Sequence, residues 1–329
     1  MNPAPSVILL TTLIGAGQGL FLALFTVHSY ALVGLLPASD GRALLAGGSA
    51  LSLALLAAGL LASFFHLGRP ERAWRSAAQW RTSWLSREVI VLPAFMAAVA
   101  LYGALQAAGW SPVLLSASGL AIDLGIVVGA AAAVLAFALF VCTGMIYAAV
   151  RFLAEWHTPL TPINYTLLGG ASGFTLAAGL AALVAPHRVG FLAGWAIVLT
   201  VLAALGRLAS LWRNARLVPR STIQTAIGVK HPQVVQKSQG FMGGSFNTRE
   251  FFHGRSDATL RRLRKLCLAG AFGLPLALLL AALLTLLAAA PAALLVAAAL
   301  LQYLGLLAER WLFFAEARHP QNLYYQRMA

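Results

Sequence analysis

Residues 66–88, HLGRPERAWRSAAQWRTSWLSRE, form a polar segment between two long apolar runs. The first run ends at Phe65 and the second begins at Val89, and the segment between them holds five arginines and three tryptophans. His66 therefore stands at the end of one predicted membrane helix, and Glu88 stands at the start of the next. Two ionisable groups at a membrane edge suit a site where protons meet a small polar head group.

The composition indicates an integral membrane protein. The chain has 329 residues, of which 60% are apolar and 10% are charged, whereas soluble domains are about 45–50% apolar and about 25% charged. The apolar residues form runs long enough to cross a bilayer, which takes roughly 20 residues of helix. We predict an all-α fold with eight transmembrane helices in a single polytopic membrane domain, residues 1–329. The predicted spans cover about 6–36, 43–65, 88–109, 116–150, 164–185, 189–212, 266–289 and 292–314.

Two features of the apolar runs predict that the first span is retained in the mature protein and that some helices pack closely. The run of residues 6–36 is too long for the apolar core of a cleaved signal peptide, so we expect it to be retained as the first span. Glycine pairs at helical spacing, Gly15 with Gly19 and Gly169 with Gly173, would let neighbouring helices approach closely.

The distribution of Lys and Arg predicts the orientation. All but three of the 23 basic residues fall on one side of the predicted spans, the exceptions being Arg42, Arg188 and Arg207. Basic residues accumulate in cytoplasmic loops. We therefore expect a multi-pass membrane protein with both termini and the 66–88 segment in the cytoplasm.

Residues 213–265 form a basic cytoplasmic loop that is a candidate docking segment. A basic loop beside a bilayer is commonly held by anionic lipid, each cation contributing about 1 kcal/mol. The loop also contains an aromatic and glycine-rich stretch at 240–254, and Phe and Met are typical of buried protein interfaces. Membrane lipid and a docked protein partner both remain open, and nucleic acid is disfavoured because no soluble binding fold is present. The candidate docking residues are Arg72, Arg75, Arg249, Phe251 and Phe252.

Catalysis by this chain alone is poorly supported. The sequence has no glycine-rich phosphate loop, nucleophile elbow or glycosidase-like carboxylate pair, so no catalytic residue is assigned. Cys142 and Cys267 are too few for a metal cluster, so iron–sulfur or molybdenum chemistry would have to lie on another chain. His28 and His66 are the histidines within or at the end of spans, and we expect them at opposite faces, where they cannot share a haem.

His66 and Glu88 are the main candidates for chemistry. Beside Arg69, a histidine favours the neutral imidazole, which can donate a hydrogen bond to a quinone carbonyl or accept its proton. The alternative for His66 is an interfacial or capping residue. Glu88 is favoured at a helix start by the helix dipole, and its alternative is an ion pair with Arg87 or Arg81. Ser86 is the predicted N-cap of that helix.

Other polar residues near the spans have simpler interpretations. Gln18 lies in a glycine-rich part of the first span, and Asp123 is expected to start a helix in water. Glu309 and Arg310 are neighbours for which a local ion pair is expected. His157 follows the fourth span and could reach the same cytoplasmic pocket as His66.

Four motifs together resemble the dimethyl sulfoxide reductase anchor-subunit family. They are residues 17–18 (GQ), 66–70 (HLGRP), 85–88 (LSRE) and 309–310 (ER), and the eight-span plan covers the whole chain. The resemblance implies two four-helix bundles that hold a quinone site, for ubiquinone or menaquinone, near the face that docks an iron–sulfur subunit. That subunit would connect to a catalytic subunit with molybdopterin, and no haem is expected.

The resemblance also implies roles for individual residues. His66 would be nearest to the quinone chemistry, and Glu88 would shape the pocket or relay protons. Gly68 and Arg69 match the turn that positions His66. The complete set of candidate quinone-binding residues is His66, Gly68, Arg69, Ser86, Glu88, Arg81 and Gln18.

Three longer motifs resemble one branch, the membrane subunit of cytoplasmic sulfite dehydrogenases. They are residues 80–88 (WRTSWLSRE), 155–162 (EWHTPLTP) and 246–252 (FNTREFF). The predicted function is therefore transfer of electrons from sulfite oxidation to quinone. Alternatives are the anchor of a dimethyl sulfoxide-type reductase that oxidises menaquinol, an assembly scaffold without a quinone site, and a secondary transporter. Transport is disfavoured because the ionisable residues cluster at one membrane edge rather than at mid-span.

Overall fold

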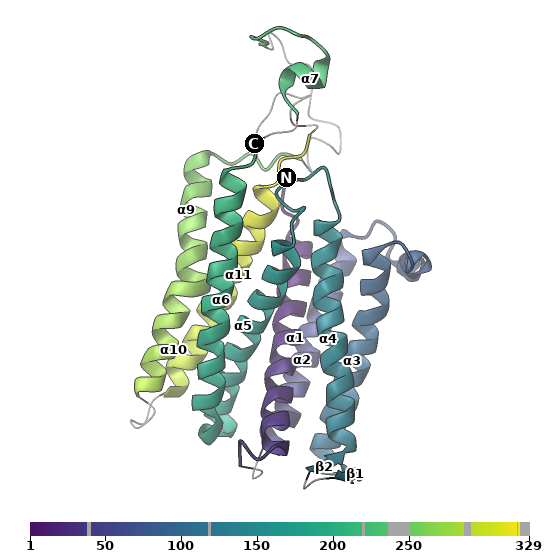
Figure 1. Ribbon diagram of the computed structural model, residues 1–329, viewed down its shortest axis with the longest axis vertical. Helices are drawn as coiled ribbons and strands as arrows, with labels where there is room; N and C mark the ends of the chain where they lie inside the picture. Colours follow the sequence, from purple (N-terminus) through teal and green to yellow (C-terminus); the bar gives the residue numbers. More distant parts are fainter. Residues whose placement is uncertain are drawn as a thin grey trace.

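Eight helical segments of the computed structural model are long and apolar enough to cross a membrane, counted over the described residues: 1–37, 41–117, 120–218, 221–235, 251–285, 291–320 and 322. They stand side by side (Figure 1). The prediction of an all-α membrane protein with eight spans is confirmed. The long helices are α1 (Pro5–Leu32), α2 (Arg42–Ser63), α3 (Trp84–Ala108), α4 (Leu124–Ala148), α5 (Leu160–Val184), α6 (Val189–Ala215), α9 (Asp257–Leu268) continued by α10 (Leu274–Leu284), and α11 (Pro291–Ala315).

The helices form two groups of four. Helices α1 to α4 pack around one another, and α5, α6, α10 and α11 form the second group. The groups meet where α5 packs against α1 and α4, and the largest apolar core cluster includes residues of both. The spans alternate in direction. One end of the molecule therefore holds the first residues of α1 and α3 and the last residues of α2 and α11 (Figure 1). We call it the basic end.

Several observed helix ends differ from the predicted span ends, and α3 and α5 each begin four residues early, at Trp84 and Leu160. The first helix ends at Leu32 rather than 36, just before Gly34, which has φ 74° and interrupts the helix. The fourth begins at Leu124 rather than 116, because β1 (Val113–Ala117) and β2 (Leu120–Asp123) pair as an antiparallel hairpin. The seventh begins at Asp257, nine residues before the predicted start at 266.

That seventh span begins as a basic helix. Residues 257–265 were predicted as part of the loop 213–265, because their charges exclude them from an apolar run. In the structure, α9 begins after the N-cap Ser256 and continues through the basic stretch to Leu268. A π-helical turn, η4 (Ala269–Gly273), joins it to α10. The basic residues thus lie on a helix that extends past the apolar run, and α7 (Ile223–Ile227) is a short helix earlier in the segment.

The crossing of α1 and α5 depends on glycines. A Cβ added to Gly173 would lie 1.9 Å from the carbonyl carbon of Gly19, and one added to Gly19 would lie 1.9 Å from the carbonyl oxygen of Gly169. No side chain fits at such distances, so the backbones of the two helices touch. The expected close approach at the pairs Gly15 with Gly19 and Gly169 with Gly173 is therefore found between α1 and α5.

We predict that Gly173→Ala destabilises the protein by roughly 1–3 kcal/mol, because the new methyl group must push two helix backbones apart. Gly194→Ala is the matched control, since a Cβ at Gly194 meets nothing within 4 Å. Thermal unfolding of the two purified variants in detergent measures the difference. Equal melting temperatures for both variants would show that the crossing tolerates a side chain.

Candidate functional site

The loop 66–88 connects α2 to α3 at the basic end. Helix α2 continues into a short 3₁₀ turn, η1 (Phe64–His66), and η2 (Pro70–Gln79) follows as a second 3₁₀ segment that begins at a proline. The fixed φ of a proline such as Pro70 favours the first turn of a helix. His66, Gly68 and Arg69 are all exposed, and η2 packs against α3. The predicted turn therefore presents His66 at the surface of the basic end.

Arg87 fixes the end of this loop on α3. Its Nε donates a hydrogen bond to the carbonyl oxygen of Trp80 (2.9 Å), and its Nη2 donates to that of Arg81 (2.8 Å). The guanidinium lies 4.3 Å from the centroid of the Trp84 ring. Among the described residues, neither Arg87 nor Arg81 forms an ion pair with Glu88. The alternative prediction, an ion pair of Glu88 with one of these arginines, is therefore wrong.

The N-cap of α3 is Ser83 rather than Ser86. The helix begins at Trp84, and the Ser83 hydroxyl accepts a hydrogen bond from the Ser86 N–H (3.3 Å). Ser83 has the extended backbone that an N-cap requires, with φ −105° and ψ 125°. The prediction that Ser86 is the cap was wrong, because two serines three residues apart offer the same pattern. Ser86 instead lies buried in the first turn of the helix.

Glu88 points toward α4. The Thr143 hydroxyl of α4 donates a hydrogen bond to Glu88 Oε1 (2.5 Å). Glu88 lies four residues after the start of α3, which is about 6 Å along the helix axis. A carboxyl group held between two apolar helices near the membrane edge is costly to charge and is in general a sign of a functional site.

Gln18 lies much deeper than Glu88. It stands 13 residues after the start of α1, about 20 Å along the helix. Its Nε2 donates to the carbonyl oxygen of Ala136 in α4 (2.9 Å). This bond ties α1 to α4, and the quinone-site role of Gln18 stays a prediction. The predicted quinone-binding residues thus lie in three places. Four are exposed in the loop (His66, Gly68, Arg69 and Arg81), and Ser86 and Glu88 are in the first turns of α3. Gln18 lies deep between α1 and α4.

The candidate docking residues also divide. Arg72 and Arg75 are on η2, where Arg72 pairs with Glu71 (3.9 Å) and Arg75 lies 5.5 Å from the centroid of the Trp74 ring. Arg249 lies outside the described residues. Phe251 and Phe252 fold back onto their own chain.

Phe251 and Phe252 are covered by the segment after α11. The Phe251 ring stacks on His319 at 4.0 Å, Asn322 Nδ2 donates to the Phe251 carbonyl oxygen (3.1 Å), and Phe252 is buried. Burial lowers the pKa of His319 and of His253 below the ordinary value, so both imidazoles are neutral at pH 7. A docking role for these two phenylalanines stays a prediction, and their rings already have partners within this chain.

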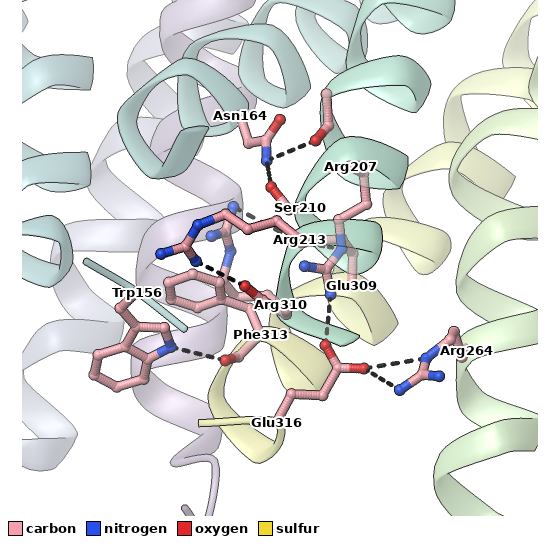
Figure 2. Close-up of polar contacts among 12 residues, drawn as sticks. Trp156, Asn164, Arg207, Ser210, Arg213, Arg264, Glu309, Arg310, Phe313 and Glu316 are labelled. Atoms are coloured by element: carbon pink, nitrogen blue, oxygen red, sulfur yellow. Dashed lines mark hydrogen bonds and ion pairs between the residues drawn. The ribbon is translucent and has the colours of Figure 1, made fainter. Parts of the chain in front are cut away.

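A second polar cluster at the basic end was not predicted from the sequence. Arg207 of α6 pairs through Nε with Glu309 Oε1 of α11 (3.2 Å) and through Nη2 with Glu316 Oε2 (3.3 Å). Arg310 pairs with Glu309 Oε2 (3.6 Å), which confirms the expected local pair, and Arg264 of α9 pairs with Glu316 (2.7 Å). Figure 2 shows these side chains converging from three helices. We call these five residues the charge cluster.

The charge cluster borders a small cavity. The cavity offers about 20 Å³ to the centres of water-sized molecules. Asn164 Nδ2 in its wall donates to Ser210 Oγ (2.8 Å), whereas Asn164 Oδ1 and Arg310 Nε are buried without a hydrogen-bond partner among the described residues. The Arg310 guanidinium lies 3.8 Å from the centroid of the Tyr165 ring. The lining residues are Glu155, Trp156, Thr161, Asn164, Tyr165, Arg207, Ser210, Asn214, Glu309, Arg310, Phe313 and Glu316.

Three further residues were singled out in the sequence. Asp123 Oδ1 accepts a hydrogen bond from the Ile126 N–H (2.8 Å), which confirms that it starts α4. His157 is exposed, and its Nδ1 lies 2.6 Å from the Ala148 carbonyl oxygen. His28 bonds to the Tyr102 hydroxyl (2.9 Å) near the end of α1, at the opposite end of the molecule from His66.

Comparison with known proteins gives two matches. The family model of the DMSO reductase anchor subunit (DmsC) matches residues 1–315. The chain is 56% identical over 330 residues to a sulfite dehydrogenase subunit of Allochromatium vinosum, and the alignment covers 100% of both chains. The similarity therefore extends over all eight spans and both polar features of the basic end.

Proposed function

The chain belongs to the DMSO reductase anchor subunit family, and we propose that it carries electrons from a sulfite-oxidising complex to the quinone pool. Membership makes it a multi-pass membrane protein and the anchor of a multisubunit oxidoreductase with catalytic and electron-transfer partners. The observation that carries the choice of sulfite is the 56% identity, over the whole chain, to a subunit of a sulfite dehydrogenase.

The proposed partners are an iron–sulfur subunit and a molybdopterin catalytic subunit. Oxidation of sulfite to sulfate with one water releases two electrons and two protons. The iron–sulfur subunit would pass the electrons to a quinone, ubiquinone or menaquinone, which takes up two protons to become quinol. No haem is proposed for this chain, because His28 and His66 lie at opposite ends of the bundle.

The basic end is the proposed cytoplasmic side of the bacterial inner membrane. Of the 23 Lys and Arg residues, Arg42 and Arg188 are the two that the sequence places in loops at the other side. Both termini would then be cytoplasmic, and the partners would dock beside η2, which carries Arg72 and Arg75. The same end carries His66 and Glu88, so electrons would reach the quinone close to the docking face.

Within this site, His66 and Glu88 would act on the two protons of the quinone. A neutral imidazole can donate a hydrogen bond to a quinone carbonyl, and the carboxyl group of Glu88, held by Thr143, can give a proton to it. Ser86, Gly68, Arg69 and Arg81 would shape the entrance.

The function is tested by mild-detergent purification of the tagged chain, with mass spectrometry and metal analysis. We expect iron, molybdenum and two further subunits to co-purify, and sulfite to reduce decylubiquinone. A complex that oxidises no sulfite but couples quinol to dimethyl sulfoxide would establish the reductase alternative. A chain that purifies without partner subunits and without metal would instead favour the transporter alternative.

We predict that His66→Arg lowers sulfite-driven quinone reduction by roughly 10²-fold, because a permanent cation cannot exchange a proton. Sulfite-driven reduction of ferricyanide, which needs only the partner subunits, should be unchanged. His187→Arg is the matched control, since His187 is exposed at the opposite end. Quinone reduction at the wild-type rate in the His66→Arg variant would show that His66 does not take part in the quinone reaction.

A further inference from the structure

The hydrogen bond of Glu88 leads along α4 toward the cavity. Thr143, which donates to Glu88, lies one helical turn before Tyr147. Residues four apart lie on the same face of a helix, so Thr143 and Tyr147 share one face of α4 near its basic end, and Glu88 of α3 bonds to the first of them.

Tyr147 connects this line to the cavity wall. Its ring stacks on that of Tyr165 in α5, with centroids 5.7 Å apart and an interplanar angle of 19°. The Tyr165 hydroxyl is buried and has no hydrogen-bond partner among the described residues. Tyr165 in turn lines the cavity and lies under the Arg310 guanidinium. The side chains of Thr143, Tyr147 and Tyr165 therefore lie one after another between Glu88 and the cavity, and the bond from Thr143 to Glu88 is the hydrogen bond that joins the first of them to the carboxyl group.

The cavity suits water. Its volume exceeds the roughly 10–15 Å³ that one water molecule requires, and a buried water needs two to four polar partners. The unpaired Asn164 Oδ1 and Arg310 Nε provide an acceptor and a donor, and the Tyr165 hydroxyl can provide both. The charged or titratable groups around the cavity are Glu155, Tyr165, Arg207, Glu309, Arg310 and Glu316, with Arg264 bound to Glu316 from outside.

The outer wall of the cavity reaches the surface of the basic end. Arg264, the outer partner of Glu316, has a side chain that is 45% exposed, against 13% for Glu316 and 2% for Glu309. Exposure thus decreases stepwise from α9 toward the α6–α11 interface. On the inner side, the rings of Trp156, Phe313 and Phe314 pack around Tyr147. These rings limit access to Tyr147 from the lipid and leave the cavity as its polar neighbour.

We propose that this cavity is a water-holding proton-entry site, which supplies Glu88 with protons through Tyr165, Tyr147 and Thr143. The proposal rests on the proposed function, because quinone reduction is what consumes the protons. Each quinone takes two electrons from the iron–sulfur partner and two protons from the cytoplasm. When Glu88 gives one proton to the quinone oxygen, each hydroxyl passes its own proton inward and takes one from its outer neighbour. The last proton comes from the cavity water, which takes up a replacement proton from the cytoplasm at the exposed side of the cavity, so neither a charged tyrosine nor hydroxide accumulates.

The test replaces each tyrosine by Phe, which removes one hydroxyl and keeps the stacked ring. In the purified complex, Tyr147→Phe and Tyr165→Phe should each lower kcat for decylubiquinone reduction by roughly tenfold or more, with KM unchanged. The solvent isotope effect in D₂O should rise, because proton transfer becomes rate-limiting. Sulfite-driven ferricyanide reduction should stay at the wild-type rate.

Tyr303→Phe is the matched control. Tyr303 lies on α11 and bonds to Thr12 (3.3 Å), away from the cavity, so its loss should leave kcat and the isotope effect unchanged. Wild-type kcat and isotope effect in both test variants would overturn the relay. So would a fall in kcat with a raised KM and a lowered melting temperature, which would indicate structural damage. A wild-type complex that reduces no quinone would instead overturn the proposed function.

Discussion

Glu88→Gln is expected to lower sulfite-driven quinone reduction by roughly 10²-fold or more, the usual contribution of a positioned acid–base group. The amide has nearly the shape of the carboxyl group and can still accept the Thr143 hydrogen bond at its oxygen. It cannot release or take up a proton under these conditions. A lower rate of quinone reduction with an intact fold would therefore measure the loss of proton transfer by Glu88. Ferricyanide reduction by the same preparation should be unchanged.

Two companion variants sharpen this result. Asp257→Asn makes the same change at an exposed carboxylate in the first turn of α9, and it should leave both activities at the wild-type level. Thr143→Val removes the hydrogen bond but keeps the carboxyl group, so its loss of rate should be smaller than that of Glu88→Gln. Quinone reduction at the wild-type rate in Glu88→Gln would show that the protons travel by another route.

The eight spans and the basic end could be predicted because they depend on composition within short windows. Apolar runs of about 20 residues and uneven Lys and Arg counts are visible without any tertiary contact. The span ends were less accessible. At Asp257 the helix begins within a charged stretch, and at Val113 a hairpin forms from residues apolar enough to look like membrane helix.

The charge cluster was missed because its pairing is long-range. Arg207 and Glu309 lie about one hundred residues apart, and their contact depends on how α6 and α11 pack. The sequence offered two signals, a lone arginine within a span and an adjacent Glu and Arg in another. A buried arginine commonly pairs with a carboxylate or with backbone carbonyl oxygens, so considering these two signals together would have suggested the contact.

The sequence correctly placed Glu88 near the start of the third long helix, but it could not identify the residue that Glu88 contacts. Thr143 lies in another helix, and a threonine in an apolar span carries no special signal. Likewise, Gln18 was grouped with the site because its motif resembles the family, whereas its depth in α1 follows only from the helix start at Pro5.

Glu309→Met is expected to destabilise the protein by roughly 3–5 kcal/mol, the cost of leaving a buried charge without its partner. Glu309 pairs with both Arg207 and Arg310, and the three side chains are only 2%, 4% and 5% exposed. Its removal leaves Arg310 without the carboxylate that the structure gives it. Thermal unfolding and SDS titration of the purified chain measure the loss.

Arg264→Met and a double variant separate this effect from simple loss of an ion pair. Arg264 is 45% exposed, so its removal should cost no more than about 1 kcal/mol. Combining Glu309→Met with Arg310→Met removes the buried pair and leaves Arg207 with Glu316, and apolar side chains of similar volume can replace a buried pair at little cost. The double variant should therefore be more stable than Glu309→Met alone. If it is less stable by the sum of both single losses, the two residues act independently, and the buried pair does not explain the cost.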